Sequence, residues 1–372
     1  MKDKLKFSLL PSADALTGDE GVPVLQEGVN KLSSSNAVKA FIEKALSNST
    51  FTKDNPDIVA FTKTGAGTAT TSQKIWVNVG ATVLEIASGT TITMPTLAVG
   101  TDYAIWVKPD GALEATTNFT SPPVTDARKI GGFHYAPGGN ATAQSGGNTT
   151  AQINEYSFWD LNFRPACQDP RGMTLVAGGL WADIYLLGVD HYTNGTSKYN
   201  VTIADGSAPP KVPSAFGGNG STAYANGTWW VMSEVGKAYG KRLPTYSEFA
   251  ALAYGTTEAT SSGGTDVPTT GVNGTGATSG WQVFTSKWGV VQSSGCLYIW
   301  GDEFGGPYLG ASWAANTGGR GSTYNLSNAV LLGGNWDLGA NSGSRTSIWN
   351  NSPPNSGDNI GGRLVCDHLK II

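Results

Sequence analysis

Glycine makes up 50 of the 372 residues, and this abundance limits the chain to short elements joined by many turns. Glycine, asparagine and serine are turn formers, so we expect short strands rather than long helices. Only 14% of the residues are charged, yet 12 are tryptophan. Disordered chains are typically rich in charge and poor in aromatic residues. The composition therefore indicates a folded, mainly β protein that is long enough for two or three domains.

Charge and cysteine usage exclude several classes of function. The net charge of −4 and the absence of a basic stripe argue against nucleic acid as a partner. Cys167, Cys296 and Cys366 form no CxxC motif, so we expect small buried thiols rather than zinc ligands or a disulfide framework. No apolar run suits a secretory signal or a membrane span. We expect a soluble protein made in a cytoplasm, without membrane insertion.

Residues 1–47 differ in pattern from the rest of the chain. Short apolar pieces are broken by proline and glycine, which is typical of short strands and tight turns. A short helix is predicted over 36–46, because Val38, Phe41, Ile42 and Ala45 fall on one helical face. So small a unit buries too little surface to be stable alone. We expect it to pack on copies of itself or on the next domain.

Residues 48–160 have an all-β pattern. Alternating or β-branched runs recur, and Pro109-Asp110-Gly111 marks a turn between two of them. The economical architecture for such a segment is a β-sandwich. Residues 136–152 are polar and of low complexity, and are expected to form a surface loop.

From residue 161 to 372 the pattern changes to α+β. A strand pair is predicted with its turn at Gly178-Gly179. One helix is predicted within 229–241, ending at Gly240. A second, within 243–255, begins with a capping box, Thr245-x-x-Glu248, and is expected to end at Gly255. The remaining connections are long, and long ordered loops tend to carry function.

No catalytic or metal-binding constellation is visible in the residues alone. His134, His191 and His368 are far apart and lack metal-type spacing. The adjacent Asp302 and Glu303 are too few oxygen ligands for calcium, so a salt bridge in a loop is the simpler interpretation. No phosphate-binding glycine loop and no nucleophile elbow occurs. Neither a cofactor nor a metal is therefore predicted.

Four ordered runs near the C-terminus nevertheless resemble a known domain. They are GKRLPTYSEFAALA, SGCLYIWGDEF, LLGGNWDLGANSGSRTSIWN and IGGRLVCD. Together they resemble the C-type-lectin-like domain of the formylglycine-generating enzymes. In those enzymes a cysteine pair follows the Gly-Gly-x-Trp strand, whereas Leu338 and Gly343 stand in that neighbourhood here. The resemblance therefore implies the fold without the oxidase chemistry, and it implies six framework residues that hold it: Gly333, Gly334, Trp336, Arg345, Trp349 and Arg363.

A more extensive resemblance runs from about residue 59 to 369. Runs such as GGNTTAQINEYSFWDLNFRPA and DPRGMTLVAGGLWADIYLLGV are similar to the major tropism determinants, a family of phage tail-fibre tip proteins. The first 50 residues instead resemble another phage tail element. The resemblance implies a homotrimer with a β-prism-like trimerisation element (1–47), a β-sandwich (48–160) and a C-type-lectin-like domain (161–372). It also implies location at the tail-fibre tip of the virion, and as partners a bacterial surface receptor, protein or glycan, and other tail-fibre proteins.

That family diversifies its tip through a retroelement, which copies a template with errors at adenines. Carried onto this sequence, the variable region spans about 333–365. All its variable positions hold Asn or a residue reachable from an Asn codon, and 322–369 contains no Lys, Glu, Gln or Met. The excess of Asn indicates either a polar or glycan-like target or a sequence close to the unselected template. The variable positions are Asn335, Asp337, Gly339, Asn341, Ile348, Asn350, Asn351, Asn355, Gly357, Asn359 and Ile360.

Three other functions were weighed against receptor binding. A formylglycine-generating enzyme is disfavoured by the missing cysteine pair. A calcium-dependent lectin is disfavoured because Asn335-Trp336-Asp337 is not a Trp-Asn-Asp motif and no Glu-Pro-Asn triplet occurs. A purely structural fibre protein would show no excess variation at the eleven positions among clones of the gene.

Overall fold

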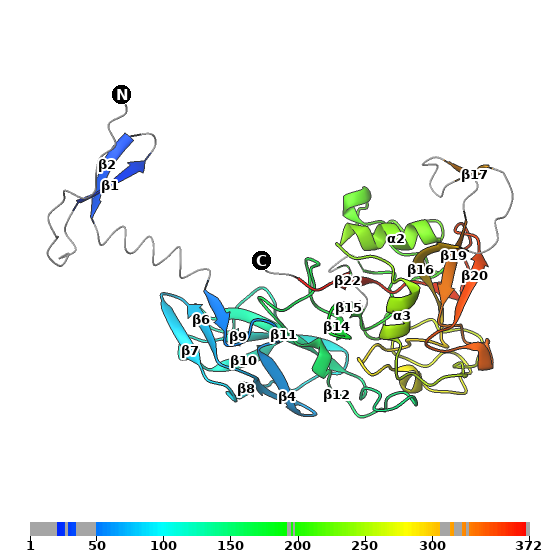
Figure 1. The fold of residues 1–372 in the computed structure, drawn as a ribbon, viewed down its shortest axis with the longest axis horizontal. Helices are drawn as coiled ribbons and strands as arrows, with labels where there is room; N and C mark the ends of the chain where they lie inside the picture. The colour runs from blue at the N-terminus through cyan, green and yellow to red at the C-terminus, as the bar shows by residue number, and fades with distance from the viewer. Residues whose placement is uncertain are drawn as a thin grey trace.

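The computed structural model describes residues 21–26, 29–34, 50–191, 195, 198–305, 313–315, 322–324 and 327–369 (Figure 1). Near the N-terminus, β1 (Gly21–Gln26) and β2 (Val29–Ser34) pair antiparallel, as the short strands predicted there require. The helix predicted over 36–46 lies outside the described residues.

Residues 50–160 form the predicted β-sandwich, called the sandwich below. Its largest sheet has the order β12-β11-β9-β10-β8, with β13 also paired to β11. Opposite it lie the sheets β3-β6-β7 and β4-β5. Side chains such as Phe61, Ile75, Tyr103 and Phe133 from both layers share one buried core. The strands are β3 (Phe51–Lys53), β4 (Phe61–Gly65), β5 (Thr68–Thr71), β6 (Ile75–Val79), β7 (Thr82–Ile86), β8 (Ile92–Thr93), β9 (Thr101–Val107), β10 (Leu113–Thr116), β11 (Arg128–Ala136), β12 (Gln152–Ile153) and β13 (Trp159–Asp160).

The turn predicted at Pro109-Asp110-Gly111 joins β9 to β10. Gly111 has φ +84°, and Asp110 Oδ1 accepts a hydrogen bond from the Ala112 amide at 3.0 Å. Such Asx contacts replace the backbone bonds that a chain loses where it reverses. The prediction is confirmed.

Residues 136–152 reach the surface as expected, with 142–145 and 148–150 exposed, but they are also bonded to the C-terminal part. The Ala141 amide donates to the Ser286 carbonyl (3.1 Å), and the Gly147 amide donates to the Gln282 carbonyl (2.9 Å). Gly138 and Gly139 are buried, and a Cβ at Gly138 would lie 2.9 Å from the Trp281 ring. Glycine is needed at position 138 because the Asn148 carbonyl and the Trp281 ring leave no room for a Cβ. The two backbone bonds fasten the loop to the residues that follow the sandwich.

Residues 161–369, the C-terminal part, contain two further sheets. In the first, β15 (Leu180–Asp183) lies between β14 (Met173–Val176) and β22 (Val365–Asp367), so the beginning and end of this part are paired. The second has the order β20-β19-β16-β21, from β16 (Tyr298–Gly305), β19 (Asn328–Leu332), β20 (Ser347–Asn351) and β21 (Ile360–Gly361). A separate hairpin joins β17 (Trp313–Ala315) and β18 (Ser322–Tyr324). Short 3-10 helices are η2 (Glu155–Ser157), η3 (Ser214–Phe216), η4 (Trp281–Phe284) and η6 (Gly339–Asn341).

Both predicted helices are present and lie beside the second sheet (Figure 1). α2 (Trp229–Ala238) is followed by its C-cap residue and then by Gly240 at φ +72°, as the sequence predicts. α3 (Tyr246–Leu252) begins with the predicted capping box, in which Thr245 and Glu248 satisfy each other's backbone amides. It ends at Leu252, three residues before Gly255. None of the described helices is long and apolar enough to cross a membrane.

The cysteines, His134 and the Asp302-Glu303 pair, for which the sequence predicts structural roles, can now be placed. Cys167, Cys296 and Cys366 are free and buried. His134 bridges the two parts, with Nδ1 2.9 Å from Asp102 Oδ1 and Nε2 2.9 Å from the Tyr185 hydroxyl. The salt-bridge interpretation of Asp302-Glu303 is wrong for Glu303, whose Oε2 accepts a hydrogen bond from the Tyr246 amide at 2.6 Å. A carboxylate is favourable there because the first amides of α3 are otherwise unpaired.

Candidate functional site

Two loops flank strand β20 in the part of the molecule away from β6 and β7 (Figure 1). Loop 1 covers residues 333–346, between β19 and β20. Loop 2 covers residues 352–359, between β20 and β21. All five residues of β19 are buried, so this strand provides a fixed base for loop 1 and for β20, which pairs with it antiparallel.

Gly333 and Gly334 turn the chain out of β19. Their φ angles are +88° and +84°, a region that residues with a side chain rarely adopt. A Cβ at Gly333 would also lie 2.8 Å from Phe249 Cζ, and one at Gly334 would lie 2.4 Å from Ser342 Oγ. Glycine is therefore required at both positions by conformation and by space.

Substitution of Gly333 by alanine is expected to lower the free energy of unfolding by roughly 2–3 kcal/mol, because backbone strain adds to a steric clash. The matched control is Gly339→Ala in loop 1. Gly339 also has positive φ (+58°), but nothing lies within 4 Å of a Cβ there, so strain alone should cost about 1 kcal/mol. Denaturant unfolding followed by tryptophan fluorescence measures the free energy of unfolding of both variants. Equal losses in the two variants would show that Phe249 moves aside for the new methyl group and that the steric clash is absent.

Loop 1 is held in part by side chains of residues 258–263, which lie outside the predicted variable region. Glu258 accepts from the Ser344 amide (2.9 Å) and hydroxyl (2.5 Å). Ser261 donates to the Trp336 carbonyl (2.8 Å) and accepts from the Gly339 amide (3.1 Å). These side chains contact loop 1 through backbone atoms or through Ser344, which is not among the predicted variable positions.

Loop 2 is held mainly by hydrogen bonds between backbone atoms. The Gly206 amide donates to the Gly357 carbonyl (2.9 Å), and the Tyr298 amide donates to the Asn359 carbonyl (3.0 Å). The Gly227 amide donates to Ser356 Oγ (2.8 Å). Bonds to carbonyl oxygens of Gly357 and Asn359 do not depend on which side chain those positions carry.

The structure places nine of the eleven predicted variable positions at least partly in solvent. Asp337, Asn341, Asn350 and Asn355 are exposed, and Gly339, Ile348, Asn351, Gly357 and Asn359 are half-buried. Asn355 Nδ2 donates to Asn351 Oδ1 (2.6 Å) across the start of loop 2. The nine positions thus lie along loop 1, β20 and loop 2.

Asn335 and Ile360 differ from the other nine because both are buried. Asn335 is 3% exposed, and its Oδ1 has no hydrogen-bond partner among the described residues. Ile360 is 7% exposed and packs in the cluster that contains Tyr298 and Leu364. Side chains at these two positions therefore contribute to the fold, and the half-buried Ile348 packs against the same cluster as Ile360.

The framework residues divide into buried and exposed members. Trp336 is buried, and its carbonyl accepts from the Gly263 amide at 2.9 Å. Trp349 is only half-buried, with its ring edge-on to Tyr246 at a centroid distance of 6.4 Å. Arg345 is exposed, and its carbonyl accepts a hydrogen bond from the Tyr246 hydroxyl at 3.2 Å.

Arg363 is fully buried directly after β21. Its guanidinium donates to the carbonyls of Asp183 (2.7 Å), Ile184 (2.9 Å), Val291 (2.6 Å) and Gln292 (3.1 Å). Burial lowers the pKa of Arg363 to about 9, so the side chain remains a cation at neutral pH. A single residue therefore joins the end of β15 to the segment that precedes β16.

Two further groups near the loops have shifted pKa values. Burial, with a smaller contribution from Asp337, raises the pKa of Tyr298. Burial is also the largest cause of the raised pKa of Asp205, to which Asp266 and Asp358 add, while bonds from the Ser207 and Ala208 amides oppose it. Asp205 precedes Gly206, which supports loop 2.

Asp205→Asn is expected to remove a pH dependence of stability. Because the pKa of Asp205 is raised in the folded protein, its contribution is fully present below the unfolded pKa and is lost as the pH rises through the folded pKa. Asparagine keeps the Oδ1 acceptor for the two amides. The variant should be more stable than the wild type at pH 7, with the difference shrinking as the pH falls toward 4. Denaturation midpoints at several pH values test this; a constant difference would contradict it.

No three His, Cys, Asp or Glu side chains gather closely enough to hold a metal ion within the part of the chain that the structure describes. Cys296 lies beside loop 1, where its backbone forms an isolated β-bridge with Asn335. Burial raises the pKa of its thiol to about 12. Leu338 and Gly343 occupy loop 1 where the formylglycine-generating enzymes carry their cysteine pair.

Comparison with known proteins identifies the family. A tail fiber receptor-binding protein of Bordetella phage BPP-1 is 61% identical over 322 residues, which cover 86% of this chain and 84% of the relative. The chain belongs to the major tropism determinant family. Residues 59–160 match the family described as the Mtd second domain. Among solved structures, the Major Tropism Determinant I1 variant gives a TM-score of 0.85 at 62% identity, covering 87% of this chain and 86% of that one.

The P3c variant of the Major Tropism Determinant is similar over a longer stretch, 95% of this chain and 94% of that one, with a TM-score of 0.86 at 56% identity. The family fold, a β-sandwich followed by a C-type-lectin-like part, is thus the fold expected from the sequence. Sequence reasoning missed the constant residues Glu258 and Ser261 that hold loop 1. The only signal was the length of the Gly/Thr/Ser-rich stretch in which they lie.

Proposed function

We propose that this major tropism determinant is a receptor-binding protein of a phage tail fibre, and that loops 1 and 2 with β20 form the face that binds a bacterial surface receptor, protein or glycan. The observation that carries the proposal is the separation of roles in the loops. Constant residues such as Glu258 and Ser261 bond to backbone atoms, while Asp337, Asn341 and Asn350 point their side chains into solvent. The similarity to a tail fiber receptor-binding protein of Bordetella phage BPP-1 supports the same function.

We further propose that the eleven variable positions are diversified from a retroelement template by mutation at adenines. Asparagine suits this role physically as well as genetically. Position 339 has φ +58°, a conformation that Asn, Asp and Gly tolerate better than other residues. The exposed positions accept any side chain without loss of a described contact to the framework, whereas Asn335 and Ile360 accept only residues that fit a buried site.

The same proposal covers assembly. Residues 1–47 would trimerise or attach the protein, residues 48–160 would serve as a spacer, and residues 161–372 would face the host from the tail-fibre tip of the virion. Three copies on one fibre raise avidity by roughly 10²–10⁴ without new contacts. A polar face of Asn and Gly, poor in the aromatic residues that anchor most interfaces, then needs only weak affinity at each copy.

Catalysis is not part of the proposal. The relatives are named for receptor binding and tropism, and Leu338 and Gly343 supply no thiol. Oxidation of a cysteine in a substrate peptide would revive the enzyme reading, and calcium-dependent sugar binding in a calorimetric titration would revive the lectin reading.

Two experiments test the proposed function separately. Purified full-length protein should block adsorption of its phage to host cells, and failure to compete would contradict receptor binding. The DNA beside the gene should contain a near-identical repeat of the region encoding 333–365 and a reverse transcriptase reading frame. Their absence would contradict diversification while leaving receptor binding intact.

A further inference from the structure

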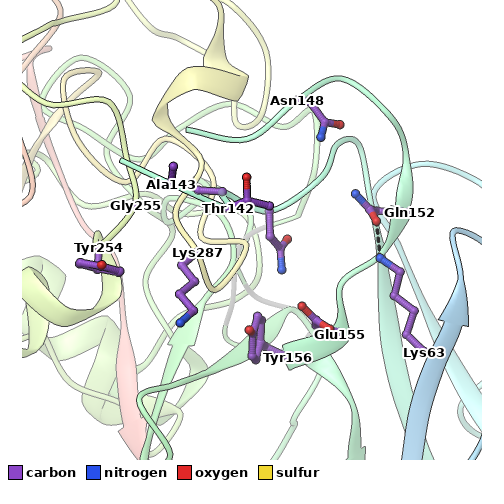
Figure 2. A pocket seen from close by; sticks show the side chains of 12 residues that line it. Lys63, Thr142, Ala143, Asn148, Gln152, Glu155, Tyr156, Tyr254, Gly255 and Lys287 are labelled. Atoms are coloured by element: carbon purple, nitrogen blue, oxygen red, sulfur yellow. Dashed lines mark hydrogen bonds between the residues drawn. The ribbon is translucent and has the colours of Figure 1, made fainter. Parts of the chain in front are cut away.

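A second site lies at the junction of the sandwich and the C-terminal part, and none of its lining residues belongs to loop 1 or loop 2. A cavity of about 450 Å³, the junction pocket, opens between them (Figure 2). Lys63 of β4, Gln152 of β12 and Tyr156 of η2 line it from the sandwich, while Tyr254 and Lys287 line it from the C-terminal part. Its volume falls in the ~300–1,000 Å³ range of small-molecule sites.

The walls of the junction pocket are fixed by bonds between and within the two parts. The Gly146 amide of the sandwich donates to the Gly255 carbonyl (2.9 Å), and within the C-terminal part the Lys287 amide donates to the Tyr254 carbonyl (2.8 Å). Asn154 Nδ2 donates to the Trp288 carbonyl (3.1 Å), behind the pocket. A ligand would therefore enter a preformed cavity and would not have to order its walls.

Charged groups enter the pocket from both parts. In Figure 2, Glu155 and Tyr156 lie between the ammonium groups of Lys63 and Lys287. Lys63 donates to Gln152 Oε1, and burial lowers the pKa of Lys63, an effect that Glu155 partly opposes. Lys287 is exposed, and its Nζ lies 5.1 Å from the centroid of the Trp288 ring. Two lysines against one carboxylate leave an excess of positive charge for a ligand anion to neutralise.

The remaining lining is suited to hydroxyl groups. Glu155 can accept hydrogen bonds from hydroxyls, and the amide groups of Gln152 and Asn148 can both donate and accept. The Tyr254 ring is 48% exposed at the edge of the pocket, where it can cover an apolar ring face. Donors and acceptors beside an exposed aromatic ring suit a sugar ring, which has hydroxyl groups at its edge and an apolar face.

We propose that the junction pocket binds an acidic saccharide, whose anionic group contacts Lys63 and Lys287 and whose hydroxyls contact Glu155, Gln152 and Asn148. The site is separate from the face formed by loops 1 and 2, and it consists of residues outside the predicted variable region. It would give every variant of the protein the same weak contact with acidic surface glycans, whichever receptor its variable face selects.

Calorimetric or NMR titration of the purified full-length protein tests the proposal with matched ligands. Galacturonic acid and galactose differ by one carboxylate, and galacturonic acid should bind at least about tenfold more tightly. Lys63→Met with Lys287→Met should weaken galacturonic acid binding by about tenfold or more and leave galactose binding unchanged. Lys74→Met, which removes a sandwich lysine paired with Glu85 far from the pocket, should change neither.

Each contrary outcome overturns the proposal for a different reason. If galacturonic acid and galactose bound equally tightly, the lysines would not recognise the carboxylate. If the double variant bound galacturonic acid as tightly as the wild type does, the sugar would bind outside the junction pocket. Equally tight binding of inorganic phosphate would indicate an anion site without saccharide recognition. If light scattering gave a lower molar mass for the double variant than for the wild type, the two lysines would hold copies of the chain together. A second copy of the chain, and not a saccharide, would then occupy the pocket. None of these measurements involves the receptor, so they stand apart from the test of the proposed function.

Discussion

Arg363→Met is expected to lower the free energy of unfolding by about 4 kcal/mol or more, the largest single-residue effect predicted for this protein. The substitution leaves the carbonyls of Asp183, Ile184, Val291 and Gln292 without the donor that joins them. An unpaired buried polar group costs roughly 1–3 kcal/mol, and partial relaxation or entry of water reduces the sum. Denaturant unfolding followed by tryptophan fluorescence should show an early transition of the C-terminal part.

Arg345→Met provides the matched control, because Arg345 is an exposed arginine in the same region of sequence. It should change the free energy of unfolding by no more than about 0.5 kcal/mol. Arg363→Lys should lie between the two, since an ammonium keeps the charge but cannot reach all four carbonyls with one planar group. Equal stability of Arg363→Met and Arg345→Met would contradict the assignment of Arg363 as the main polar support.

Replacing four exposed variable residues together is expected to change binding to host cells by about 100-fold or more. The substitutions are Asp337→Tyr, Asn341→Tyr, Asn350→Tyr and Asn355→Tyr, all of which place a large aromatic group on the proposed binding face. Tyrosine dominates many interfaces because it buries a large area at low entropic cost. Adsorption assays on the original host measure the effect, which would be a loss unless the new side chains fit that receptor.

The control variant also carries four tyrosine substitutions, but at exposed polar residues of the sandwich: Thr52, Asp57, Thr62 and Asn118. That variant should adsorb as the wild type does. Equal loss of adsorption in both variants would show that tyrosines interfere non-specifically. Unchanged adsorption in the first variant would place the receptor contact outside loops 1 and 2.

Much of the fold could be predicted from local sequence because the signals are local. The turn at Gly178-Gly179, the capping box of α3 and the glycine after α2 each depend on residues a few positions apart. Gly333, Trp336 and Arg363 could be named through resemblance, and their places in the structure are those of buried or conformationally required residues.

Other features depend on contacts across long stretches of chain, and no local pattern shows them. Glu258 and Ser344 are 86 residues apart, and nothing near either one indicates the pair. Residues 136–152 have the composition of a free loop, but they bond to a segment about 140 residues later. Arg345 has the same chemistry as Arg363 and yet is exposed, because its position in loop 1 follows from the backbone bonds of its neighbours.

In loops 1 and 2 the contacts that hold the fold and the proposed binding contacts come from different atoms. This separation explains how a binding face can change without loss of the fold. Backbone groups at Gly357, Asn359 and Asn341 carry hydrogen bonds that are independent of their side chains. Constant side chains supply the remaining contacts. The proposed diversity therefore falls mainly on side chains that the framework does not contact, with the buried Asn335 and Ile360 and the half-buried Ile348 as exceptions.

Stability measured across two small libraries tests this account most directly. One library randomises Asp337, Asn341, Asn350 and Asn355, and the other randomises Glu258, Ser261, Gly333 and Ser344 in the same way. Proteolysis of the pooled variants in increasing denaturant gives each a free energy of unfolding. The account predicts that most members of the first library fall within about 1 kcal/mol of the wild type, whereas most members of the second lose more than about 2 kcal/mol. Similar distributions for the two libraries would contradict it.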